Sequence, residues 1–82
     1  MRIRVACLGA FRELGDHIEI DVNGETIGAL RHATRDFLVA HGNDGLASVL
    51  ERSVFAGDDI LLKDHDAIPS APLSVLPPVA GG

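Results

Sequence analysis

The 82-residue sequence lacks the residue types that several kinds of site and partner need. Its one cysteine, Cys7, rules out an internal disulfide, which is typical of a reducing compartment. Tryptophan and tyrosine are absent and only three phenylalanines occur, so aliphatic side chains must supply most of the core. No stretch approaches the about 20 apolar residues that span a bilayer, and the apolar run after Met1 is too short for a signal peptide. These absences predict one small cytoplasmic domain with no membrane partner.

Positive charge is also scarce, because seven Lys and Arg stand against 12 Asp and Glu and the net charge is −5. An acidic surface repels phosphates, so we expect no nucleic-acid partner. The same charge favours a protein partner with a basic groove. Because hydrophobic residues make up 46% of the chain, the sequence is that of a globular domain and not of a disordered one.

The sequence contains no arrangement of side chains typical of catalysis or of metal binding. The acidic stretch from Asp58 to Asp66 lacks the bidentate glutamate of a calcium loop, and no phosphate-binding glycine loop or serine elbow occurs. Cys7 lies on the apolar phase of its segment, which predicts a buried, inert thiol. The four histidines lack zinc-ligand spacing: His17, His32, His41 and His65. We expect a chain that is not an enzyme by itself and binds no cofactor or metal.

The hydrophobic periodicity predicts an α+β chain. Residues 2–7 and 17–22 alternate with period two and are expected to form a hairpin across a turn at 12–16. A helix is predicted from Thr26, the N-cap, to about residue 41, before Gly42. Its apolar side should carry Phe37 and His41, and Arg31 should lie on the opposite side. Residues 43–50 are ambiguous, with spacing that suggests a short helical turn. Further strands are expected at 53–56, 60–62 and 73–76.

This order of a hairpin, a crossing helix and a return to the sheet predicts a β-grasp, ubiquitin-like fold. We expect a mixed sheet of four to five strands packed by one main helix, with the last strand central and parallel to the first. The β-grasp domain would cover residues 1–76. Residues 77–82 would form a flexible C-terminal tail.

The tail ends in Gly81-Gly82, after Pro77-Pro78-Val79-Ala80. Glycine has no Cβ and can pass extended through a narrow channel, while the two prolines fix their own φ and direct the segment away from the domain. The six residues reach roughly 20 Å when extended. We therefore expect the carboxylate of Gly82 to be the functional group.

Three segments of the chain resemble the small subunit of molybdopterin synthase, a member of the ubiquitin-fold sulfur carriers. They are Phe11-Arg12-Glu13-Leu14-Gly15, Thr26-Ile27-Gly28-Ala29-Leu30-Arg31 and the segment from Leu73 to Gly82. The last of these is the most specific, and residues 42–70 match only loosely. Pro69-Ser70-Ala71-Pro72 departs from the acidic turn that is usual in the family, and this departure leaves the identity of the partner open.

The resemblance implies that a ubiquitin-activating-type adenylyltransferase uses ATP and Mg to adenylate Gly82. A persulfide donor then displaces AMP, which leaves a thiocarboxylate that gives its sulfur to a pterin precursor inside the large synthase subunit, in a heterotetramer. Gly81 would provide clearance. An exposed apolar patch beside the tail is expected to bind partners, with an arginine at its rim. The expected contact residues are Leu8, Arg12, Ile60, Leu61, Leu76, Pro77, Pro78, Val79 and Ala80.

Other functions remain open at this stage. The same thiocarboxylate chemistry would serve thiamine, thiolated-nucleoside or other sulfur pathways. A ubiquitin-like modifier conjugated to lysines through Gly82, or a plain binding domain, would also fit the sequence. Lys63 is the one lysine of the chain, so self-linked chains could form only there.

Overall fold

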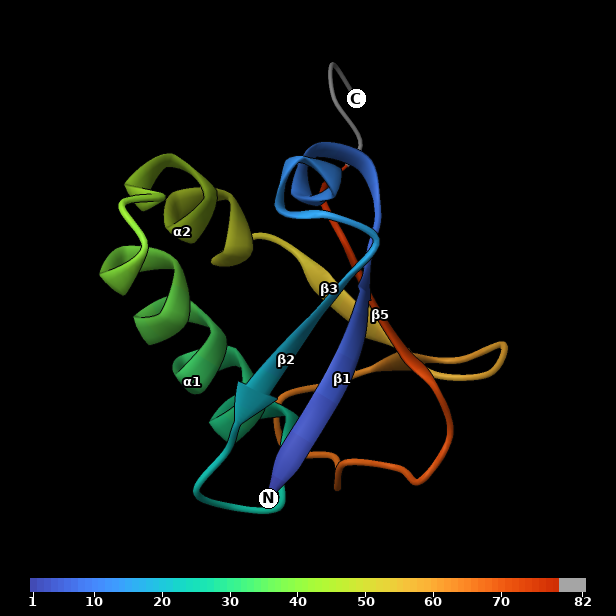
Figure 1. Ribbon diagram of the computed structural model, residues 1–82. Helices are drawn as coiled ribbons and strands as arrows, with labels where there is room; N and C mark the ends of the chain where they lie inside the picture. The colour runs from blue at the N-terminus through green and yellow to red at the C-terminus, as the bar shows by residue number, and fades with distance from the viewer. Residues whose placement is uncertain (79–82) are drawn as a thin grey trace.

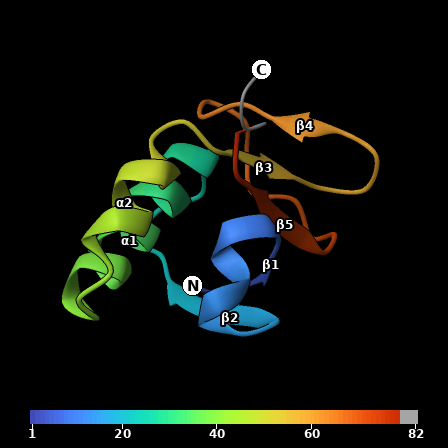
Figure 2. The ribbon, with the colours of Figure 1, turned by 90° about the horizontal axis from the view of Figure 1, so that it is seen from above.

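The computed structural model describes residues 1–78 and consists of two layers, a five-stranded sheet and a pair of helices on one of its faces (Figures 1 and 2). The helices cover only that face, so the other face of the sheet, called the open face below, carries no helix. The elements in chain order are β1 (Arg2–Cys7), the 3-10 helix η1 (Gly9–Leu14), β2 (His17–Asp21), α1 (Ile27–Ala40), α2 (Asp44–Leu50), β3 (Val54–Ala56), β4 (Leu61–Leu62) and β5 (Leu73–Leu76).

The sheet has the strand order β2-β1-β5-β3-β4. β1 pairs in parallel with β5, with Val5 opposite Leu73 and Cys7 opposite Val75. The remaining neighbours pair in antiparallel fashion. A central last strand parallel to the first was expected from the element order, and the sheet confirms it. The parallel pair requires a crossover connection, and α1 with α2 lies within it.

The core lies between the helices and the inner face of the sheet. Val5, Phe55 and Val75 come from three neighbouring strands and are completely buried, because alternate residues of each strand face the helices. The helices contribute Ile27, Leu30, Leu38, Leu46 and Leu50. Seven of these residues are aliphatic and only one is aromatic, in keeping with the scarcity of aromatic residues in the sequence.

The start of α1 is fixed by its own cap and by the segment before β5. Thr26 Oγ1 accepts a hydrogen bond from Ala29 N at 3.2 Å, which confirms the predicted N-cap. The backbone carbonyls of Asp66 and Asp64 accept from the first two helical amides, Ile27 N at 2.9 Å and Gly28 N at 2.8 Å. A Cβ on Gly28 would lie 3.2 Å from the Asp64 carbonyl oxygen, so the glycine permits this close approach.

Arg31 does not lie on a solvated helix face, so that part of the helix prediction is wrong. Its side chain is only 20% exposed. One guanidinium nitrogen, Nη1, donates to the carbonyls of Leu50 (2.6 Å) and Ser53 (2.9 Å). Nε pairs with Asp64 at 3.0 Å, and the guanidinium lies 5.4 Å from the centre of the Phe55 ring. Arg31 therefore ties α1 to the end of α2, the start of β3 and the loop after β4.

Other differences from the sequence prediction are local. Residues 44–50 form a true helix, and η1 takes up residues 12–14 of the expected turn at 12–16. The Phe11 side chain of η1 is almost completely buried. Gly15, in this turn, has a positive φ of 114°. His41 is exposed and stacks on Phe37, with 4.2 Å between ring centres, and does not join the core.

We predict that Arg31→Met lowers the free energy of unfolding by about 1–3 kcal/mol, because two partly buried carbonyls lose their donor. Arg35→Met is the matched control on the same helix, since Arg35 is exposed and its pair with Glu51 at 3.0 Å contributes under about 1 kcal/mol. Urea unfolding of both variants measures the difference. Equal losses would contradict the role assigned to Arg31.

Candidate functional site at the end of the last strand

The parallel pairing of β1 and β5 brings the residues that follow both strands to one edge of the sheet. Leu8 N, directly after β1, donates to the carbonyl of Val75 at 3.3 Å. η1 begins one residue later and contacts β5. Figure 1 shows η1 beside the end of β5, where the chain leaves the sheet toward the C-terminus. Leu76, Pro77 and Pro78 are called the tail base below.

Pro77 packs directly on the backbone of Gly9. Gly9 has φ +56°, and a Cβ at this position would lie 2.5 Å from Pro77 Cγ. Both the backbone conformation and the contact therefore require glycine. Sequence reasoning passed over Gly9, although a glycine directly after a strand is a common signal of a special backbone conformation or a close contact. This contact and the fixed φ of proline set the direction in which the chain leaves β5.

The end of β5 places Leu76 on the open face. Val75 is fully buried and Leu76 is half-buried, so the strand alternates as expected. Val54 of β3 lies opposite Leu76, and Leu8 is 38% exposed beside them at the end of β1. Leu8, Val54, Leu76 and Pro77 are called the exit patch. Val54 was not among the expected contact residues, although its outward phase in a predicted strand would have indicated it.

The other expected contact residues are distributed more widely. Arg12 lies exposed on η1, with Nη2 3.9 Å from Asp16. Ile60 is 59% exposed but lies in the turn after β3, and β3 runs antiparallel to β5. Ile60 is therefore at the end of the sheet opposite to the tail base, and the expectation that it lies near the tail is wrong. Leu61, 68% exposed, faces the open side on the edge strand β4, three strands from β1.

The expected reacting end is not part of this geometry. Val79, Ala80, Gly81 and Gly82 lie outside the described residues. The tail base and the exit patch are thus the part of the expected site that the structure places.

Cys7 is buried with 2% exposure, as the strand pattern predicted. Burial raises the pKa of its thiol, and the negative charge of Asp16 raises it further. The thiol is therefore protonated at neutral pH and is a poor nucleophile. Within residues 1–78, no cluster of three or more His, Cys, Asp or Glu side chains could hold a metal ion. In that same part of the chain, none of the helices has the length and apolar character needed to cross a membrane.

We predict that Cys7→Ala lowers the free energy of unfolding by about 1 kcal/mol through lost packing. Because the folded-state pKa is raised, the stability that the neutral thiol contributes is present below the pKa of the unfolded thiol. It is lost as the pH rises toward the folded-state pKa. Wild-type stability should therefore fall more steeply than that of Cys7→Ala in alkaline solution. Parallel pH profiles of chemical unfolding would show whether the two curves converge, and constant separation would contradict the assignment.

Two substitutions on β5 test the register of the exit patch. Val75→Glu places a charge in the core and should destabilise the domain by more than about 4 kcal/mol. Leu76→Glu places the same side chain on the open face and should cost no more than about 1 kcal/mol. Thermal and urea unfolding measure both. If Leu76→Glu were the more damaging change, Leu76 would belong to the core.

The sequence matches no protein-family model and no curated protein. The fold, in contrast, is similar to a solved structure. The crystal structure of SAMP1 from Haloferax volcanii matches it with a TM-score of 0.64 over 100% of both chains, at 18% sequence identity. SAMP1 is a ubiquitin-like protein. With the mixed five-stranded sheet and its helix pair, this similarity shows that the chain has the α+β β-grasp fold of ubiquitin-like proteins.

Proposed function

We propose that this chain is a sulfur carrier that does its chemistry on the carboxylate of Gly82. In this proposal an adenylyltransferase of the ubiquitin-activating type uses ATP and Mg to form the Gly82 acyl-adenylate. A persulfide donor then displaces AMP and leaves a thiocarboxylate. The destination we favour is molybdopterin synthesis, with the chain as the small subunit of the synthase, because the Leu73 to Gly82 segment resembles that subunit most specifically. Other sulfur pathways would use the same intermediate.

The observation that carries the proposal is the tail base. In a β-grasp body, the central strand β5 leads straight into Pro77, whose ring is held against Gly9. The residues that follow in the sequence are small or apolar and include Gly81 and Gly82. A tail base fixed against Gly9 beside an exposed apolar patch suits delivery of the residues that follow into a partner's active site. The body supplies no catalytic group in this proposal, and the partner enzymes do the chemistry.

A second candidate is a protein modifier attached to lysines through Gly82. The structural similarity to SAMP1, a small archaeal modifier protein, favours it. Both candidates begin with the same adenylate and differ in the nucleophile that attacks it, a persulfide sulfur or a lysine amine.

Intact-mass measurement after incubation with an activating enzyme, ATP and a persulfide source tests the proposal. We expect a mass increase equal to replacing one oxygen atom by sulfur. A variant with one residue added after Gly82 should keep its fold and show no such increase. Normal adenylation of the extended variant would contradict the proposal. Isopeptide adducts to lysine in place of the thiocarboxylate would support the modifier function.

The exit patch can be tested in the same assay. Apolar burial at an interface contributes roughly 1.5–3 kcal/mol per side chain, so Leu76→Glu should slow activation at least about tenfold. Val39→Glu is the control, because Val39 is also an exposed apolar residue, at 51%, but lies on α1 on the other side of the molecule. Equal effects of the two variants would exclude a specific role for the patch.

A further inference from the structure

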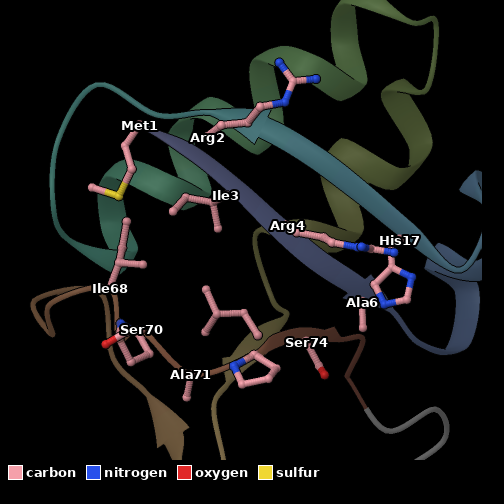
Figure 3. A pocket seen from close by; sticks show the side chains of 13 residues that line it. Met1, Arg2, Ile3, Arg4, Ala6, His17, Ile68, Ser70, Ala71 and Ser74 are labelled. Atoms are coloured by element: carbon pink, nitrogen blue, oxygen red, sulfur yellow. The ribbon is translucent and has the colours of Figure 1, made fainter.

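A groove lies on the open face, separate from the exit patch. It has a volume of about 620 Å³ and runs between β1 and the loop of residues 68–72 (Figure 3). Ile3 and Ala6 line it from the strand, and Pro69, Ala71 and Pro72 line it from the loop. The loop is anchored by Ile68 N, which donates to the Glu25 carbonyl at 2.7 Å. The volume of the groove is within the range of about 300–1,000 Å³ that is usual for ligand sites.

The charge of this groove is opposite to that of the chain. Acidic residues outnumber basic ones overall, 12 to 7, yet no Asp or Glu lines the groove while Arg2, Arg4 and His17 do. Arg2 already forms ion pairs with two residues of β2, Glu19 at 2.7 Å and Asp21 at 3.7 Å. Among residues 1–78, neither Arg4 nor His17 has an ion pair or a side-chain hydrogen bond.

Arg4 and His17 lie at the same end of the groove. Arg4 pairs with Glu19 across the β1–β2 ladder, and Ala6 pairs with His17. Arg4 and His17 are therefore diagonal neighbours on the open face, about 7–8 Å apart at the backbone. Figure 3 shows both side chains beside Ala6, with Ser70 and Ala71 across the groove. The Arg4 guanidinium and the His17 ring can donate hydrogen bonds to a single carboxylate placed between them. Glu19, the residue opposite Arg4 in the ladder, accepts a hydrogen bond from Arg2 Nε at 2.7 Å.

We infer that the groove binds an extended segment of a partner protein, with an Asp or Glu side chain held by Arg4 and His17 and apolar side chains on Ile3, Ala6 and the prolines. The groove has apolar lining residues and a cationic residue, Arg4, at one end. An extended segment that carries both apolar and acidic side chains matches this lining. A nucleic acid is disfavoured because its many phosphates meet the net charge of −5. Ser74 lines the groove, and Leu76 lies two residues further along the same face of β5. A partner that contacts the exit patch can therefore reach the groove as well, although groove binding does not depend on the chemistry at Gly82.

Amide chemical-shift mapping on the full chain tests the inference with two short, end-blocked peptides. One has a single glutamate between valines and threonines, and the other has glutamine in its place. We expect the glutamate peptide to shift the amides of Ala6, Ala71 and Ser74 and to bind about three- to fivefold more tightly, as an exposed charge pair allows. Arg4→Gln, which removes the charge and keeps a polar side chain, should remove that preference. Arg52→Gln makes the same charge change at an exposed residue before β3 and should preserve it. The spectra also report whether each variant is folded.

Three results would overturn the inference. They are equal binding of the two peptides, loss of the preference in Arg52→Gln as strongly as in Arg4→Gln, and stronger shifts of the same amides by inorganic phosphate or a short RNA. Self-association of the chain through the groove, seen as shifts that depend on its own concentration, would also overturn it. The variant extended after Gly82 should bind the glutamate peptide normally. A failure of the sulfur-carrier proposal can thus be told apart from a failure of this one.

Discussion

The rest of the structure depends on the parallel pairing of β1 with β5. This ladder sets Cys7 beside Val75 and makes the last strand central, so the chain must cross over through α1 and α2 before it returns to the sheet. Because both strands run in the same direction, the residues that follow them share one edge. The contact between Gly9 and Pro77 and the exit patch are direct results of that pairing.

Arg31 holds together the segments of the crossover that the parallel pair requires. Its guanidinium joins α1 to the carbonyls that end α2 and precede β3, and to Asp64 in the loop before β5. That loop in turn supplies the carbonyls that cap the first turn of α1. One largely buried cation thus connects segments that are far apart in the sequence. In a domain of 82 residues with a thin core, such polar ties are important because a small apolar interior contributes limited stability.

The open face divides into two regions with different chemistry. Near the tail base it is apolar, with Leu8, Val54 and Leu76. Further from the tail base it carries Arg4 of β1 and His17 of β2 beside an apolar groove. No Asp or Glu lines this groove, so the net charge of −5 conceals a local site of opposite sign. In the proposed function, partners that handle the tail approach over this face, because the helices cover the other one.

Much of the fold could be predicted from the sequence, because period-two and period-3.6 patterns report which side of each element is buried. Neighbouring residues alone predict the alternation of β1 and β5, the Thr26 cap and the burial of Cys7. They also suggest that a directed tail begins at Pro77. The role of Arg31, the position of Ile60 and the groove at Arg4 were decided only by the tertiary structure. Each depends on which strand lies next to which and in what direction, and those pairings join residues 11 to 68 positions apart in ways that local patterns do not encode.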